Sequence, residues 1–231
     1  VEIGRVSDGR RDAAVHSRAV EDYLKAIFKL QGESDPVSTT ALAAELDRSA
    51  ASVTNMVKGL AEQGLLVHEP YHGARLTEAG ETAALKIIRR HRVIETYLIE
   101  RLGYTWDGVH AEAERLEHAA SEDLIDRMAR ALGDPLEDPH GAPIPSSEGI
   151  IERRDLVALG ELSEGAAAVV REVPDEDSER LRELAAAGFL LGTEVVVVAR
   201  RGDGRLVVRV GGSETELDAA TAGMIRLERK N

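Results

Sequence analysis

The chain has no cysteine among its 231 residues. This absence excludes disulfides, thiolate zinc sites and thiol-based redox sensing. Any bound metal must therefore be held by carboxylate oxygens and imidazole nitrogens, a ligand set that points toward manganese or ferrous iron. The chain also lacks an apolar run of membrane-spanning length, and residues 1–12 carry mixed charges with no apolar stretch like that of a signal peptide. We therefore expect a soluble, cytoplasmic protein.

Positive charge is scarce, because 29 Lys and Arg stand against 42 Asp and Glu and give a formal net charge of −13. Such a charge argues against a protein that coats nucleic acid indiscriminately. The deficit is uneven: residues 1–80 hold 9 basic and 12 acidic side chains, whereas the rest of the chain holds 20 and 30. A near-neutral first module beside an acidic body suits a DNA-binding protein whose affinity is conditional, with bound divalent cations neutralising part of the acidic charge.

The first eighty residues carry the pattern of a winged helix-turn-helix. Apolar residues recur at spacings of three and four over 16–30, which predicts an amphipathic helix that ends at Gly32. Hydroxyls at 38–40 can cap a second, short helix through Leu46, and a third helix follows the turn at 47–49 and runs to Gln63. Two short strands, at 65–67 and 74–76, flank a turn-rich tip and would form the wing. This order of elements is typical of helix-turn-helix proteins.

The third predicted helix presents small polar side chains away from its apolar positions. Such side chains can approach base edges in the major groove, and Asn can pair with adenine through two hydrogen bonds. The side chains expected to face outward on this helix are Ser49, Ala51, Ser52, Asn55 and Lys58. Phosphate contacts position such a module without reading sequence; the candidates are Thr39, Thr40, Lys58, Tyr71 and Arg75. A capped, polar helix face with no partner is the alternative interpretation.

Beyond the wing, the pattern predicts two helical segments and then strands. Thr77 can cap a long helix to Arg101, a second helix spans 106–132, and a proline-rich loop covers 135–145. Strands at 168–170, 194–199 and 206–210, a short helix at 178–187 and a hairpin turn at 203–204 indicate a small barrel of SH3-like size. We predict a mainly α chain with a small β domain: a winged helix-turn-helix (1–82), a helical dimerisation domain (83–153) and an SH3-like domain (154–231).

Potential metal ligands are concentrated on the second of these predicted long helices. Residues three and four apart share a helix face, so His110, Glu114, Glu117 and His118 form one stripe. His91 and Glu95, at i and i+4, lie on the preceding helix. A stripe of this kind is also compatible with a solvated helix face that binds nothing. Taken together, the ligands on the two helices favour a metal site.

The order of these parts, together with several motifs, resembles the diphtheria toxin repressor family, including its manganese transport regulator branch. The resemblance runs from about Arg18 to the C-terminus. It rests on Glu21-Asp22-Tyr23-Leu24, on Arg90-His91-Arg92, on Val109-His110-Ala-Glu-Ala-Glu114 with Glu117-His118, and on the segment Pro139 to Pro145. The resemblance implies a homodimer that binds double-stranded operator DNA when loaded with a divalent metal and that represses metal-uptake genes.

The resemblance also implies two metal sites. The family's primary site falls on Asp22, Glu114, Glu117 and His118. Its ancillary site falls on His91, Glu95 and His110, with Glu172 and Asp175 as ligands from the SH3-like domain. Lys25 stands where the manganese branch has a glutamate of its two-metal cluster, so two separate sites are expected here.

The identity of the ligands bears on the metal. Asp22 and Glu114 stand where iron-responsive members carry Met and Cys, and replacing sulfur by carboxylate favours hard cations. We therefore expect Mn(II) as the effector, with Fe(II) as the alternative and with Co(II) or Zn(II) able to bind in vitro. We expect neither a membrane partner nor a small organic substrate.

Two other classes of function remain open from the residues alone. Di-metal oxidases also use carboxylate and histidine ligands on helices, but they need Glu-x-x-His pairs on two helices. Here Arg115 stands three residues before His118, and the sequence contains no His-Glu-x-x-His. A winged-helix regulator that senses a small organic ligand without metal is the other alternative.

Overall fold

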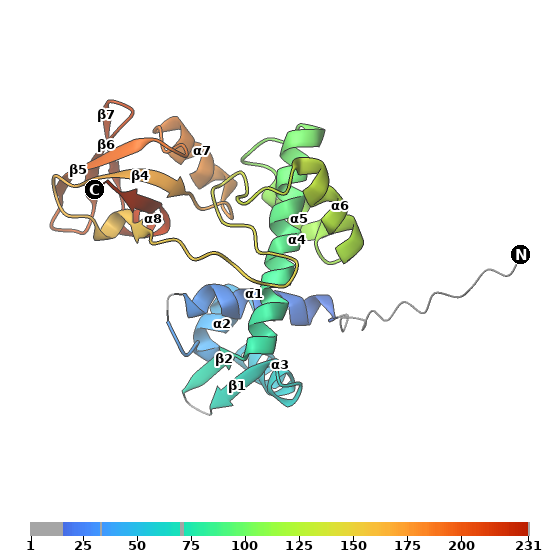
Figure 1. Ribbon diagram of the computed structural model, residues 1–231. Helices are drawn as coiled ribbons and strands as arrows, with labels where there is room; N and C mark the ends of the chain where they lie inside the picture. The colour runs from blue at the N-terminus through green and yellow to red at the C-terminus, as the bar shows by residue number, and fades with distance from the viewer. Residues whose placement is uncertain (1–15, 33, 70–71, 231) are drawn as a thin grey trace, which may run out of the picture. The chain divides into compact units, whose positions relative to one another are not determined.

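The computed structural model describes residues 16–32, 34–69 and 72–230. The chain divides into two compact units at Glu81 and Thr82, close to the start of the long helix α4 (Glu78–Leu102). Figure 1 shows the elements of both units, which are described separately below. The further boundary predicted after residue 153 lies inside the second unit and stays a prediction.

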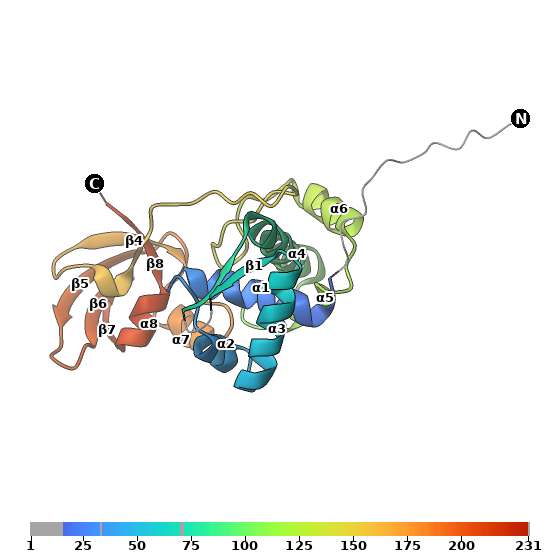
Figure 2. The same cartoon turned by 90° about the horizontal axis from the view of Figure 1, so that it is seen from below.

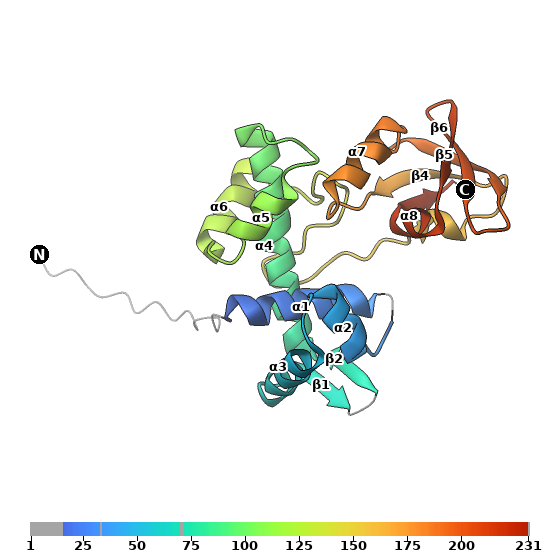
Figure 3. The same ribbon diagram turned by 180° about the vertical axis from the view of Figure 1, so that it is seen from behind.

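The described residues of the first unit form three complete helices, a two-stranded antiparallel sheet and the start of α4 (Figures 1 and 3). Each helix begins directly after a serine whose hydroxyl accepts a backbone N–H of the first turn: Ser17, Ser38 and Ser49. The elements are α1 (Arg18–Gln31), α2 (Thr39–Glu45), α3 (Ala50–Glu62), β1 (Leu66–Glu69) and β2 (Gly73–Leu76). The predicted winged helix-turn-helix is therefore confirmed.

The wing is fastened to the segment between α1 and α2 by backbone contact. Val37 donates its N–H to Ala74 O over 3.0 Å, and Ala74 donates its N–H to Val37 O over 2.9 Å. Gly73 has φ +118°, and a Cβ there would lie 2.5 Å from Val37 O. Only glycine permits both that conformation and that close approach.

Three helices form the first part of the second unit, and Figures 1 and 3 show α5 and α6 beside α4. They bury a common core of Val93, Ile94, Leu98, Val109, Ala113, Ile125 and Ala129. The prediction of one helix over 106–132 is wrong, because the structure has α5 (His110–Leu116) and α6 (Glu122–Leu132). Ser121 starts a new helix by accepting the N–H of Leu124, and residues 117–121 form the turn between the two.

The second part of this unit is a six-stranded antiparallel sheet in the order β3-β8-β4-β5-β6-β7, which Figure 2 shows together with α7 and α8. Alternate residues of the strands point inward around Phe189, which is fully buried. The predicted SH3-like fold of this part is confirmed. Its elements are β3 (Val157–Ala158), η1 (Leu159–Glu161), β4 (Ala167–Glu172), α7 (Ser178–Ala186), β5 (Glu194–Arg200), β6 (Leu206–Val210), β7 (Ser213–Leu217), α8 (Ala219–Met224) and β8 (Arg226–Arg229).

Among the described residues, no helix has both the length and the apolar composition needed to cross a membrane.

Candidate metal centre

Helices α4 and α5 bring two histidines against a buried glutamate. His91 and Glu95 lie one turn apart on α4, and His110 is the first residue of α5. The carboxylate of Glu95 is fully buried; its Oε1 lies 3.0 Å from His91 Nε2 and 3.3 Å from His110 Nδ1. The two imidazoles approach each other to 3.1 Å between His91 Nε2 and His110 Nδ1. This is the geometry of ligands that surround a common point.

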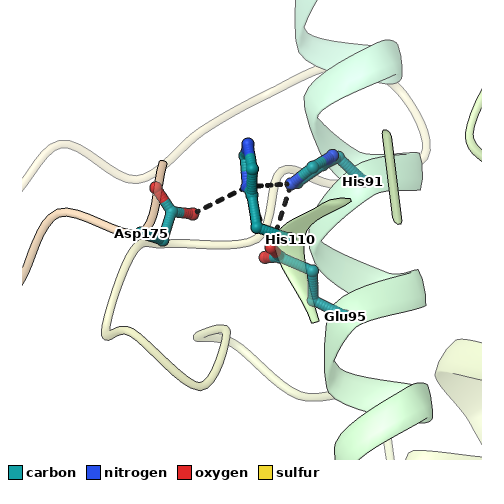
Figure 4. Close-up of side chains that lie close together, drawn as sticks. All are labelled: His91, Glu95, His110 and Asp175. Atoms are coloured by element: carbon teal, nitrogen blue, oxygen red, sulfur yellow. Dashed lines mark hydrogen bonds and ion pairs between the residues drawn. The ribbon is translucent and has the colours of Figure 1, made fainter. Parts of the chain in front are cut away.

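Asp175 completes this group from the segment between β4 and α7. Its Oδ2 lies 3.7 Å from His110 Nδ1. In Figure 4 the carboxylate of Asp175 points at His110 from the side opposite α4. One ligand atom from each of His91, Glu95, His110 and Asp175 lies within 4.8 Å of the others. The family resemblance implies an ancillary site of these four residues together with Glu172; the structure brings the four together, and Glu172 is not part of the group.

A second group of ligands shares Glu95 and Asp175 but adds two residues of the proline-rich loop, Asp138 and His140. His140 Nε2 lies 3.0 Å from Trp106 O, and a carbonyl only accepts, so Nε2 carries the proton. The other nitrogen, Nδ1, lies 3.9 Å from Glu95 Oε2 and 3.9 Å from Asp175 Oδ2. The lone pair of His140 Nδ1 is therefore available to a metal at the center of this group.

The buried polar atoms of this second group test whether the residues fit a metal ion. Glu95 Oε2, Asp138 Oδ2 and His140 Nδ1 are buried, and none has a hydrogen-bond partner among the described residues. Buried polar atoms are normally paired, and leaving one unpaired is costly. A divalent cation bound by two carboxylate oxygens and an imidazole nitrogen satisfies all three, so the residues fit the metal that the ligand types indicate.

Charge interactions within the cluster shift the pKa values of its members. Burial lowers the pKa of His110, but hydrogen bonds to Asp175 and Glu95 outweigh burial and raise it to about 10. Burial raises the pKa values of Glu95 and Asp175, yet contact with His110 and the other histidines holds both below their ordinary values. Burial raises the pKa of Asp138 to about 6, with Arg92 opposing. A proton on His110 thus balances the carboxylates that a metal ion would otherwise neutralise.

The charges around the second group suit a single divalent ion. Glu95, Asp138 and Asp175 supply three negative charges when ionised, and Arg92 supplies one positive charge, with its Nε 3.4 Å from Asp138 Oδ2. Once His110 has lost its proton, one dication brings this sum to zero. Neutralisation of this kind is what allows several carboxylates to share a buried site.

A third group lies on the other side of His91. His91 Nδ1 lies 2.6 Å from Glu117 Oε2 and 3.8 Å from Glu114 Oε1, and these three residues form a further set of potential ligands. Glu117 is fully buried, and its Oε1 lies 3.4 Å from His118 Nε2. Since α5 ends at Leu116, the predicted stripe is not one helix face; Glu117 and His118 lie in the turn that follows. His91 therefore contacts the first group through Nε2 and the third group through Nδ1.

The loop that carries Asp138 and His140 is held against the end of β4. Asp138 Oδ1 accepts the N–H groups of His140 and Ala142 over 2.8 and 3.0 Å, which shapes the loop into a tight turn. Val173 donates its N–H to His140 O over 3.1 Å. Gly141, at φ +91°, leaves no room for a side chain, because a Cβ would lie 1.9 Å from Arg171 O. The loop and β4 are thus joined two residues away from Asp175.

The other predicted site residues take varied positions. Asp22 is half-buried on α1, and Glu172, at the end of β4, lies against Arg154. Ser49 caps α3, while Ala51, Ser52, Asn55 and Lys58 are exposed on it; on α2, Thr39 is half-buried and Thr40 is exposed. Arg75 is exposed on β2, with its Nε 3.0 Å from Asp35. Tyr71 lies outside the described residues.

The sequence pattern did not predict four residues of the metal centre: Asp138, His140, Trp106 and Arg92. Trp106 stacks on the imidazole of His140 with ring centroids 5.4 Å apart and donates its indole N–H to Pro139 O. The available signal was His140 itself, a potential ligand placed between proline and glycine in the proline-rich loop, which entered the sequence interpretation only as a motif of the family.

Three family models match successive parts of the chain. Residues 16–74 match "Iron dependent repressor, N-terminal DNA binding domain", and residues 77–146 match "Iron dependent repressor, metal binding and dimerisation domain". Residues 157–229 match the FeoA domain. The three matches follow one another in the order predicted for the DNA-binding, dimerisation and SH3-like parts.

Similar proteins agree with this organisation. The chain is 32% identical to the iron-dependent repressor IdeR of Mycobacterium tuberculosis, over 90% of this chain and 96% of IdeR. A manganese-dependent transcriptional repressor in complex with manganese has a TM-score of 0.85 and 38% identity, covering 91% of this chain and all of that one. The manganese regulator SloR has a TM-score of 0.79 and 30% identity, with coverages of 91% and 98%. The chain therefore belongs to the family of IdeR and diphtheria toxin repressor, which are metal-dependent, DNA-binding transcriptional repressors and not enzymes.

Proposed function

We propose that this chain is a manganese(II)-dependent repressor of metal-uptake genes that binds operator DNA as a homodimer. The observation that carries the proposal is the composition of the metal centre. Carboxylate oxygens and imidazole nitrogens surround Glu95, and the chain has no cysteine. Such an oxygen-rich set suits hard cations such as Mn(II), and two similar proteins of known structure are described as a manganese-dependent repressor and a manganese regulator.

Residues of the second unit would bind the metal ion or hold its ligands in the orientation that binding requires. A bound divalent ion supplies two positive charges and a fixed coordination geometry. Glu95 of α4 and Asp175 of the segment before α7 would hold the ion, and His110, whose pKa is raised, would have to lose its proton before its Nδ1 could bind. His140 donates a hydrogen bond from its Nε2–H to Trp106 O, which would keep the lone pair of Nδ1 free for the ion.

Control of DNA binding is assigned to the other predicted site. We propose that Asp22 of α1 binds metal together with Glu114, Glu117 and His118, as the family resemblance implies. Without metal, these carboxylates repel one another, which disfavours the arrangement that metal stabilises. A metal that binds the DNA-competent arrangement about a hundredfold more tightly supplies roughly 2.7 kcal/mol of bias toward it.

DNA recognition is assigned to α3 and its surroundings. The exposed residues at the start of α3, Ala51, Ser52 and Asn55, suit base edges in the major groove, and Ser49 caps the helix there. Thr39, Thr40, Lys58, Tyr71 and Arg75 are proposed to contact phosphates. Because the family's dimer presents two such helices, the operator is expected to be a palindrome with half-sites about one helical turn apart.

Iron is the second candidate effector, and a specific observation favours it. The chain is 32% identical to IdeR, whose name describes it as iron-dependent. Fe(II) accepts the same nitrogen and oxygen ligands and binds more tightly than Mn(II) in the divalent series, so ligand type alone does not separate the two.

The test is DNA binding at matched free concentrations of Mn(II), Fe(II), Co(II) and Zn(II) under anaerobic conditions. Operator DNA is first selected from a random duplex pool with the metal-loaded protein, and binding is then measured by fluorescence anisotropy. We expect Mn(II) to produce binding that a chelator reverses. Asp175→Asn should weaken metal loading, whereas Glu183→Gln, at an exposed position of α7, should not. DNA binding that persists unchanged in chelator would refute the proposed function.

A further inference from the structure

Glu172 lies at the end of β4, three residues before Asp175. The family resemblance implies that it is a metal ligand. In the structure its Oε1 lies 2.5 Å from Arg154 Nη2, and the ion pair is largely shielded, with side-chain exposures of 25% and 21%. Among the groups of potential ligands that the described residues form, Asp175 occurs twice and Glu172 in none. The carboxylate of Glu172 is thus committed to a cation that belongs to the protein.

Arg154 contacts more than Glu172. Its Nη1 donates to Glu137 Oε1 over 2.7 Å, and its Nη2 also donates to the carbonyl oxygen of Gly141. Glu137 and Gly141 flank Asp138 and His140 in the proline-rich loop. One guanidinium group therefore links β4 to both sides of the turn that holds these two potential ligands.

The strength of this link follows from its chemistry and burial. Hydrogen bonds between a guanidinium and a carboxylate are charge-assisted, and the planar fork of arginine is already arranged to meet several acceptors at once. Glu137 is about half exposed and is screened by solvent, so Glu172 and the Gly141 carbonyl are the stronger partners. Lysine, with a single ammonium on a flexible stem, would not reproduce the three contacts.

The link spans two potential ligands from different elements. Gly141 is adjacent to His140, and Glu172 precedes Asp175 by three residues. The N–H of Val173, between Glu172 and Asp175, donates a hydrogen bond to His140 O. His140 Nδ1 and Asp175 Oδ2 lie 3.9 Å apart. Any change in how the loop sits on β4 alters that separation, and metal ligands tolerate only a few tenths of an ångström.

We propose that Arg154 and Glu172 form a clamp that positions His140 and Asp175 for metal, and that Glu172 acts through Arg154 and not as a ligand. The proposal rests on the proposed metal-binding function. The clamp and a ligand role for Glu172 predict opposite effects of removing Arg154 on metal affinity. If Glu172 were a ligand, Arg154 would compete with the metal for it, and removing Arg154 would strengthen metal binding. If the two form a clamp, removing either weakens it.

The experiment is a double-mutant cycle on the full-length protein with Mn(II) alone as the probe and with affinity measured by calorimetry. Arg154→Ala and Glu172→Ala should each weaken binding at the centre about tenfold, in the range found when partners of metal ligands are removed. The double variant should be no weaker than either single variant, because both remove the same link. Arg153→Ala, at the exposed neighbouring position, is the matched control and should bind as the wild type does. Tighter binding by Arg154→Ala, or additive losses in the double variant, would overturn the clamp.

A second readout reports the loop without metal. Trp106 is the chain's single tryptophan and stacks on His140, so its emission reports the position of the loop. In the metal-free protein, Arg154→Ala and Glu172→Ala should both shift this emission, whereas Arg153→Ala should not. A ligand role for Glu172 predicts no shift in Glu172→Ala.

Asp175→Asn separates failure of the clamp from failure of the metal centre. Wild-type Mn(II) affinity in this variant would refute the centre itself and the clamp with it. Loss of affinity in Asp175→Asn, with unchanged affinity in Arg154→Ala and Glu172→Ala, would refute the clamp alone.

Discussion

Gly141→Ala is the substitution with the most sharply defined expected effect. A Cβ at this position would lie 1.9 Å from Arg171 O, whereas real Cβ atoms essentially never come closer than 3.0 Å, so the loop or β4 must move by at least 1.1 Å. The neighbouring His140 and Asp138 move with the loop. Displacements of this size exceed the tolerance of a metal site, and we expect Mn(II) affinity to fall by about 10- to 100-fold.

Gly133→Ala is the matched control for this substitution. Gly133 has φ +84°, close to the φ of +91° at Gly141, but a Cβ there meets nothing within 4 Å. The left-handed conformation costs alanine roughly 1–2 kcal/mol at either position. Overpacking adds about 1–3 kcal/mol at Gly141 alone. The difference between the two variants therefore separates the contacts with Arg171 and Leu191 from the conformational cost.

The assays are urea unfolding, for the free energy of unfolding without metal, and calorimetric Mn(II) titration. Gly141→Ala should lose roughly 1–3 kcal/mol more stability than Gly133→Ala, and only Gly141→Ala should lose metal affinity. Equal stability losses with wild-type metal affinity in both variants would show that the loop is not held against Arg171, and the reasoning about the centre would then be wrong.

Three further predictions concern pH, metal removal and DNA. Because the pKa of His110 is raised from 6.5 to about 10, Mn(II) affinity should rise about tenfold per pH unit between these values, with about one proton released per ion in calorimetry at pH 7.5. The same proton stabilises the metal-free fold fully below pH 6.5, and this contribution should disappear as the pH rises through 10, as acid and alkaline unfolding titrations would show. Removing metal with a chelator should lower the thermal unfolding midpoint. At a free Mn(II) concentration 100 times Kd, Mn(II) should stabilise the folded protein by about 2.7 kcal/mol. A midpoint independent of Mn(II) would contradict a metal site that exists only in the folded protein. Asn55→Ala should reduce discrimination between operator and mismatched DNA by about 1–3 kcal/mol. Lys58→Ala should weaken binding to all sequences and reduce the salt dependence of binding by about one ion. If anisotropy titrations give each variant the effect expected of the other, the two roles are exchanged.

Local patterns were sufficient to predict the first unit. Serines before α1, α2 and α3 and the apolar spacing on each helix are encoded within a few residues, so the helix-turn-helix and its wing were predicted correctly. The sheet was harder. Strand β7 (Ser213–Leu217) is an edge strand with mostly exposed polar residues, and it has no apolar alternation to find.

The metal centre likewise combines residues that could be predicted from the sequence with residues that only the tertiary structure brings in. His91, Glu95 and His110 carry helical spacing, and the resemblance supplied Asp175. Asp138 and His140 join the centre only because Gly141 lets the loop approach the backbone of β4, thirty residues away in sequence. No pattern within the loop encodes that approach. The pairing of Glu172 with Arg154 is likewise a property of tertiary structure.

His91 couples metal binding at the group around Glu95 to metal binding at the group that contains Glu117. A neutral imidazole has one proton and one lone pair, and here Nδ1 faces Glu117 while Nε2 faces Glu95. An ion taken up through Nε2 obliges the remaining N–H to point at Glu117, and an ion taken up through Nδ1 reverses that assignment. Occupation of either group thus fixes the tautomer that the other group encounters. By thermodynamic reciprocity, the second group must favour or oppose the first to the same extent.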